Sequence, residues 1–197
     1  MEPKISESWG HGRRFGIVPI GNGRVYWYAT KNALEGELES ANNHKQELRK
    51  LFQGWHQPIE ALIDATDSDL ILRNDVYDRA PLKVAWGEGL VTLLGDAAHP
   101  TTPNLGQGAC QAIEDAIVLA RIFRGTANVV AALRQYEGQR RARTAYITNL
   151  SWRLGRMSQW ENSTACWLRN SLLRAVPLSI QKRQLAKVLK FDELATH

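Results

Sequence analysis

The chain has 197 residues, of which 44% are hydrophobic and 23% charged, and a formal net charge of +5, a composition typical of one or two globular domains. Its two cysteines are isolated in the sequence, which argues against a disulfide framework and predicts no metal site. Its beginning lacks a secretory signal, and no apolar run approaches the roughly 20 residues of a membrane helix. We therefore expect a cytoplasmic protein without a transmembrane segment.

The first segment with a clear pattern, RRFGIVPIGNGRVYWYAT, predicts a β-hairpin. Apolar residues alternate along both arms, and Asn22-Gly23 supplies a turn in which both residues tolerate positive φ. Tyr26 and Tyr28 then lie on the face opposite Trp27. One face of such a sheet packs and the other is free to line a pocket. Ordinary cross-strand packing of the aromatic residues is the alternative.

Between the hairpin and the middle of the chain, the pattern predicts short elements. Apolar spacing favours an amphipathic helix over 43–52, and Pro58 suits the first turn of a second helix over 58–64. Residues 69–86 are typical of a strand followed by an extended connector. The apolar run Leu90–Leu94 predicts a short strand covered on both faces, as in a parallel sheet.

The stretch VTLLGDAAHPTTPNLGQG places an acid directly after that strand and then reaches the next helix through several helix breakers. Ligands of open α/β sheets bind at the carboxyl ends of the strands, where Asp96 can accept hydrogen bonds from sugar or polyol hydroxyls. Free N–H groups at Leu105–Gly108 suit a phosphate or a partly anionic ring. Pro100 and Pro103 stiffen the connection. The alternative for Asp96 is an Asx-type turn.

The next segment predicts a helix that ends at Gly125. Its apolar stripe is mostly alanine, which allows close packing on a sheet or cofactor, and from Val118 to Phe123 it is apolar nearly all round, as a buried helix is. Cys110 is expected to be a small buried residue. The stripe consists of Ala109, Ala112, Ile113, Ala116, Ile117 and Ala120.

Three polar residues near this helix invite a catalytic interpretation that the sequence does not favour. His99 has no evident partner, so an acid–base role is the weaker alternative. Glu114 and Asp115 are expected to complement the helix dipole and to anchor the helix surface.

The C-terminal part predicts helices, with Trp152, Trp160 and Trp167 packed in a helical cap. Residues 121–197 contain 14 Lys and Arg against 4 Asp and Glu. This basic balance is typical of a solvated helix face. The alternatives are attraction of a phosphorylated cofactor, an acidic partner or a membrane surface. No nucleic-acid-binding module accompanies the charge, so we expect no nucleic-acid partner.

Three segments together carry a family resemblance. LLGDAAHPTTPNLGQGACQAIEDAIVLA closely resembles the second FAD-binding motif of the single-component FAD-dependent monooxygenases, the aromatic-ring hydroxylases and epoxidases. WGHGRRFGIVPIGNGRVYWYAT resembles part of that family's substrate domain, and YEGQRRAR resembles its C-terminal helix. The resemblance implies an α/β (α+β) fold: a partial FAD-binding Rossmann-like domain, part of a mixed β-sheet substrate domain, and a C-terminal helical segment.

The resemblance also implies where the cofactor lies. Asp96 would hydrogen-bond the ribitol or ribose part of FAD, and Pro100 and the loop Thr101–Pro103 would lie beside the isoalloxazine ring. The amides of Leu105–Gly108 would face the N1/C2=O edge of that ring and stabilise negative charge on the reduced flavin. No side chain is expected to be catalytic and none to bind a metal. The predicted cofactor-binding residues are Gly95, Asp96, Pro100, Thr102, Pro103, Asn104, Leu105, Gly106, Gln107 and Gly108.

The reaction implied by the resemblance is monooxygenation. NAD(P)H reduces FAD, and one oxygen atom of O₂ passes to a small, electron-rich organic substrate, with the protein positioning the cofactor. Hydroxylation and epoxidation both remain open. The implied domains are a partial substrate domain over 1–80, the second FAD-binding segment over 81–125, and the helical segment over 126–197.

Two motifs of the family are absent from this sequence. None of its glycine pairs forms GxGxxG between a strand and a helix, and it contains no Asp-Gly dipeptide. We therefore expect the C-terminal half of such an enzyme, acting beside a chain that carries the missing N-terminal half, with apolar sheet edges and faces left exposed. The alternative is a non-catalytic remnant or binding module that does not hold FAD alone.

Overall fold

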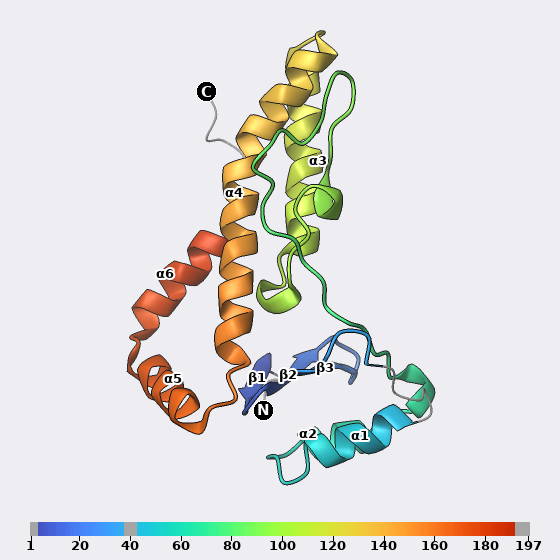
Figure 1. Cartoon of the computed structure of the whole chain (residues 1–197), viewed down its shortest axis with the longest axis vertical. Coiled ribbons are helices and arrows are strands. Elements are labelled where there is room, and N and C mark those ends of the chain that lie inside the picture. Colours follow the sequence, from blue (N-terminus) through green and yellow to red (C-terminus); the bar gives the residue numbers. More distant parts are fainter. Residues whose placement is uncertain (1–3, 38–42, 192–197) are drawn as a thin grey trace. The chain divides into compact units, whose positions relative to one another are not determined.

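The computed structural model describes residues 4–37 and 43–191. The chain divides into two compact units (Figure 1). The first comprises residues 1–76 with 158–166, and the second comprises residues 77–157 with 167–197. The domain boundaries expected from the sequence, at 80/81 and 125/126, stay a prediction.

The first unit is built on a three-stranded antiparallel sheet in the order β1–β2–β3. Its strands are β1 (Ser6–Trp9), β2 (Arg13–Pro19) and β3 (Val25–Lys31). The hairpin prediction is confirmed, because β2 pairs with β3 and the turn contains Asn22 at φ 53° and Gly23 at φ 70°. β1 was not predicted from the sequence, because it has only four residues and a polar, partly exposed pattern.

One face of this sheet packs against two helices, α1 (His44–Leu51) and α2 (Ile59–Ala65), near the helical ranges predicted for them. The core contains Phe15, stacked on Trp27 with ring centroids 5.2 Å apart, and the buried side chains Phe52, Ile59 and Ile63.

The two tyrosines of β3 lie together on the opposite face of the sheet, as expected, with ring centroids 6.2 Å apart. Tyr28 donates a hydrogen bond to Glu7, at 3.1 Å. Burial and the Glu7 carboxylate raise the pKa of Tyr28 to about 12, so the phenol stays protonated as this donor.

The second unit is built on two long helices that lie side by side, α3 (Gly108–Gly125) and α4 (Val129–Ser158) (Figure 1). The short connection between them makes an antiparallel helical hairpin. Before α3 the chain is mostly irregular, with two 3₁₀ turns at Gly95–Ala97 and Pro103–Leu105. Two further helices of the described residues are α5 (Ser163–Ala175) and α6 (Leu178–Leu189). The core cluster of this unit consists of Trp86, Ala98, Val118, Ile122, Ala132 and Tyr136.

Two predicted strands are not found. Leu90–Leu94 pairs with no strand among the described residues, although Leu94 keeps extended dihedrals. A β-ladder needs a neighbouring backbone, and without one Leu90 and Val91 remain 71% and 65% exposed. In the segment 69–86 the structure has a 3₁₀ turn at Ser68–Leu70 and then irregular chain.

The expected burial of Cys110 in α3 is wrong, and the packing of the alanine-rich stripe of this helix on a sheet or cofactor stays a prediction. The alanine-rich stripe faces outward, with Ile113 61% and Ile117 40% exposed, and Cys110 is exposed as well. The buried residues of this helix include charged and amide side chains. The three C-terminal tryptophans are exposed rather than packed in a cap. No helix of the described residues is long and apolar enough to cross a membrane.

We predict that the core of the first unit depends on Ile63. Ile63→Ala removes a fully buried side chain and should lower the free energy of unfolding by about 2–5 kcal/mol. Leu72→Ala, at a residue 83% exposed in the same unit, should change it by less than about 0.5 kcal/mol. Urea unfolding of both variants measures the difference. Equal losses would contradict the assignment of the core.

Candidate cofactor site

The turn that carries Asp96 is held from two sides by side chains distant in sequence. The backbone N–H of Gly95 donates to Asp115 of α3 at 3.0 Å. Arg79 donates to the carbonyl oxygens of Ala97 and Ala98 at 2.8 and 3.0 Å. Gly95 has φ 59°, and a Cβ there would lie 3.3 Å from the side chain of Ala112. The turn therefore requires glycine at this position, which fixes the path of the chain into Asp96.

Asp96 itself is exposed. Within the described residues its carboxylate accepts no hydrogen bond, and no side chain caps the 3₁₀ turn in which it lies. The structure therefore lacks the Asx-type bond that was the alternative for this residue. An exposed acceptor on a turn held from behind has the properties that a hydroxyl-bearing ligand requires.

The loop after this turn ends at the amino end of α3. Gly106 has φ 61° and open space around the position of a Cβ, and it is followed by Gln107, the N-cap residue. Among the described residues no side chain caps α3, and its first turn contains no acid. The backbone N–H groups of the first turn of α3 therefore remain available, and together with the positive end of the helix dipole they suit a partly anionic group.

Behind these two features lies a buried network of charges that joins α3 to α4. Asp115 accepts from Arg140 Nε at 2.6 Å through one oxygen and from His99 Nε2 at 2.6 Å through the other. Arg140 also donates to Glu114 at 2.8 Å, and Arg143 donates to Glu114 at 2.6 and 2.7 Å. Asp115 and Arg140 are 0% and 2% exposed, so neither charge has water as a partner.

The network lowers the pKa values of both of its carboxyl groups. Burial by itself raises the pKa of Asp115, but hydrogen bonds from His99, Arg140 and the Gly95 N–H outweigh it and hold that pKa below its ordinary value. For Glu114, burial is likewise outweighed by Arg143 and Arg140, so its pKa is lowered too. Both side chains are therefore anions at neutral pH.

This network corrects three expectations from the sequence. His99 does have a partner, and Glu114 and Asp115 are buried ion-pair acceptors rather than a dipole complement at the helix surface. Sequence reasoning also missed Arg79 and Arg140. The signal for Arg140 was present in YEGQRRAR, but a pairing across 25 residues cannot be read from local periodicity.

The structure brings the predicted cofactor residues together on one continuous segment, Gly95–Gly108, in the second unit. Thr102 and Asn104 turn toward α4, where both hydrogen-bond to Ser151. Pro100 and Leu105 are half-buried, and Pro103 is exposed.

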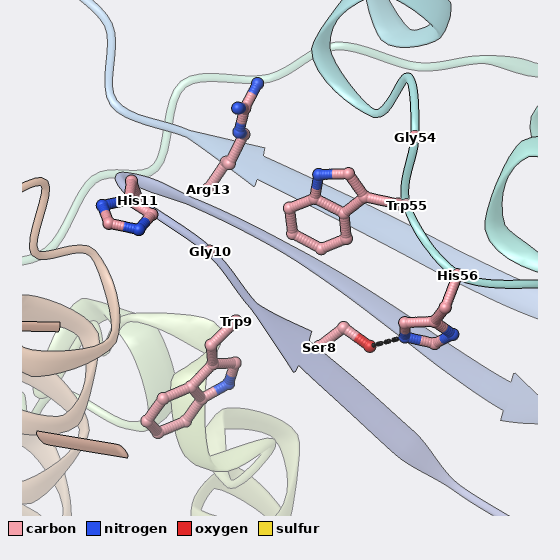
Figure 2. A pocket seen from close by; sticks show the side chains of 8 residues that line it. All are labelled: Ser8, Trp9, Gly10, His11, Arg13, Gly54, Trp55 and His56. Atoms are coloured by element: carbon pink, nitrogen blue, oxygen red, sulfur yellow. Dashed lines mark hydrogen bonds between the residues drawn. The ribbon is translucent and has the colours of Figure 1, made fainter. Parts of the chain in front are cut away.

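A hollow of about 310 Å³ lies in the first unit and is lined by none of the predicted residues. Figure 2 shows the side chains that line it. Ser8 Oγ lies 2.6 Å from His56 Nε2, and His56 Nδ1 lies 2.8 Å from the carbonyl oxygen of Gln57. The bond to that carbonyl places the ring proton on Nδ1, so Nε2 accepts from the Ser8 hydroxyl. A second hollow of similar size in the second unit is lined by Ala98 and His99 among other residues.

Comparison with known proteins identifies the family. The model of the FAD binding domain matches residues 8–151. The chain belongs to this FAD-binding family. It is 47% identical over 189 residues to the aurachin C monooxygenase/isomerase of Stigmatella aurantiaca, covering 96% of this chain and 49% of that protein. It is 38% identical over 182 residues to the 2-heptyl-3-hydroxy-4(1H)-quinolone synthase of Pseudomonas aeruginosa, covering 90% and 46%.

A solved structure agrees with this family. Klebsiella pneumoniae HpxO, crystallised with FAD and uric acid, matches with a TM-score of 0.87 and 30% identity over 94% of this chain and 47% of that one. The chain spans about half the length of these two curated relatives.

The residues present fit FAD. Among the residues that the structure describes, the exposed carboxylate of Asp96 has no hydrogen-bond partner, no side chain caps the start of α3, and the missing side chain of Gly106 leaves open space. The carboxylate can accept from hydroxyl groups, the N–H groups at the start of α3 can donate to the electron-rich edge of a ring, and Gly106 allows the ligand to approach closely.

We predict that removing Arg140 from its buried ion pair with Asp115 lowers the stability of the fold. Arg140→Met leaves two carboxylates without their buried partner and should lower the free energy of unfolding by about 3–5 kcal/mol. Arg153→Met, at an exposed position of the same helix, should change it by less than about 0.5 kcal/mol. Denaturant unfolding gives both values. A loss at Arg140 no larger than that at Arg153 would show that the network does not stabilise the fold.

The lowered pKa values predict acid sensitivity. Because Asp115 and Glu114 titrate lower in the folded chain, their ion pairs stabilise it fully above the pKa of the unfolded carboxyls, about 4, and this stability is lost as the pH falls through the lower folded values. Glu114→Gln removes one of these groups, so its unfolding free energy should depend less steeply on pH in this window. Identical slopes for wild type and variant would contradict the assignment.

Proposed function

We propose that this chain supplies the second half of the FAD site of a flavin-dependent monooxygenase. One observation carries the proposal: Asp96 and the uncapped start of α3 lie on a single segment whose first turn is fixed by the buried carboxylate of Asp115. The Asp96 carboxylate is a hydrogen-bond acceptor and the N–H groups at the start of α3 are donors. On one segment held by Asp115, they suit two different parts of one ligand. The family membership of the chain supports FAD as that ligand.

Each part of the segment has its own task in this proposal. Asp96 accepts from a hydroxyl of the ribitol or ribose chain, while Pro100 and Thr102–Pro103 border the isoalloxazine ring. The N–H groups around Leu105–Gly108 stabilise negative charge at the ring edge, an electrostatic role that needs no proton transfer. When bound, the flavin supplies the redox and oxygen-transfer chemistry. Gly95, Asn104 and Gln107 shape the segment.

We propose NAD(P)H as reductant, O₂ as the oxygen source and a small electron-rich ring as substrate. One relative is named for a quinolone product, and HpxO was crystallised with uric acid, so both names contain a bicyclic nitrogen heterocycle. A compound of this class is the first substrate to test, with hydroxylation as the expected reaction. Epoxidation of an isolated double bond is the competing outcome.

The activity further requires a segment with GxGxxG, which this sequence lacks. We propose that such a half covers the outward face of α3, where Ile113 and Ile117 are exposed beside alanines. The same exposed face favours the second candidate function, a module of this family that does not hold FAD by itself.

Flavin absorbance distinguishes these two functions. The chain is purified with excess FAD, alone and fused behind the N-terminal half of the Stigmatella aurantiaca relative, and bound flavin is measured after gel filtration. We expect little flavin on the chain alone and about one flavin per molecule of the fusion protein. A fusion protein that folds but retains no flavin would refute the proposed site.

We predict that Asp96 contributes to FAD affinity more than to turnover. A charge-assisted hydrogen bond is worth about 1.5–3 kcal/mol, so Asp96→Ala in the fusion protein should weaken FAD binding by about 10- to 200-fold. Turnover at saturating FAD should fall far less, because other groups place the ring.

Glu88→Ala is the matched control, since it removes another exposed acid of the same unit. Melting curves with and without FAD complete the test. A loss of stability by Asp96→Ala that is equal in both states would assign this residue to the turn alone.

A further inference from the structure

The loop that leads to α3 is clamped by α4 at a second place. Ser151 lies on the face of α4 that also carries Arg140, because the residues between them make about three helical turns. Its side chain is fully buried, and its Oγ lies 2.6 Å from the carbonyl oxygen of Thr102 and 2.9 Å from Thr102 Oγ1. Asn104 Nδ2 lies 2.8 Å from Thr102 Oγ1 and 3.1 Å from the Ser151 carbonyl oxygen.

The directions of these bonds follow from counting protons. The Ser151 hydroxyl has one proton, and it donates that proton to the Thr102 carbonyl. The contact between the two hydroxyls must then use the proton of Thr102, while Asn104 donates its two N–H groups to Thr102 Oγ1 and to the Ser151 carbonyl. In this arrangement the Ser151 hydroxyl is both a donor to the Thr102 carbonyl and the acceptor of the Thr102 hydroxyl proton, so removing it takes two hydrogen bonds from the turn and leaves Asn104 to hold the Thr102 hydroxyl.

Gly155, one turn further along α4, makes room for this arrangement. A Cβ at Gly155 would lie 2.3 Å from Asn104 Nδ2 and 3.0 Å from Asn104 Cγ. The amide of Asn104 cannot swing aside without losing its bonds to Thr102 and to the Ser151 carbonyl, so a larger residue at position 155 must displace the turn. Gly138 provides the contrast, since it lies in the same helix and nothing stands within 4 Å of its Cβ position.

We propose that Ser151 and Gly155 are positioning residues for FAD, which fix the turn Thr102–Asn104 and through it the amides that open α3. This inference rests on the proposed function. Asn104 lies within the 3₁₀ turn Pro103–Leu105, which runs directly into Gly106. Displacing Asn104 therefore moves the start of α3, although neither α4 residue touches the cofactor.

The test compares Gly155→Ala with Gly138→Ala, the same change in the same helix. In the isolated chain, amide hydrogen exchange of residues 101–106 should rise for Gly155→Ala and stay unchanged for Gly138→Ala. In the fusion protein, Gly155→Ala should weaken FAD binding by about 10-fold, the equivalent of one buried hydrogen bond. It should also alter the visible circular dichroism of bound flavin.

A second pair of variants tests the same contacts without changing a glycine. Ser151→Ala should reproduce both effects, whereas Thr148→Ala, also buried in α4, should lower thermal stability without changing loop exchange or flavin dichroism. Unchanged exchange in both Ser151→Ala and Gly155→Ala would overturn the clamp. Raised exchange with unchanged FAD affinity and dichroism would overturn its role toward the cofactor. A wild-type fusion protein that binds no FAD would refute the proposed function itself, and this role with it.

Discussion

The buried pair of Arg140 and Asp115 is the constraint on which the rest of the second unit depends. A charge enclosed by protein is several kcal/mol less stable than in water unless a partner with good geometry compensates it. Arg140 meets this requirement through Asp115, Glu114 and Gln111, which all lie on one face of α3. The same contacts fix the register of α3 against α4, because a slip of either helix would separate charges that water cannot reach.

Asp115 also links this scaffold to the candidate site. One carboxylate oxygen binds the guanidinium, and the other accepts from Gly95 and His99. The turn that presents Asp96 is therefore attached to the most buried charge of the unit. Because its acids pair with α4 and with the turn of Asp96, α3 buries its acids and exposes its alanines. The second half that we propose would cover this exposed apolar face.

The sequence predicted the parts of this structure that local chemistry determines. Asn22-Gly23 has one favoured turn, and alternation placed Trp27 opposite Tyr26 and Tyr28. The helix after Gly108 followed from spacing, but spacing does not say which side is buried when charged residues can pair out of sequence range. Leu90–Leu94 has the composition of a strand, yet a ladder needs a partner. The candidate residues came from family resemblance, while the side chains that hold them lie far along the chain.

A double-mutant cycle on FAD affinity tests most directly whether Asp115 acts through the turn of Asp96. The dissociation constant of FAD is measured for the fusion protein with Asp96→Ala, with Asp115→Asn and with both changes, at a temperature where all remain folded. We expect the double variant to bind FAD no more weakly than the weaker single variant, because both changes remove the same contact. Losses of binding free energy that simply add would contradict it.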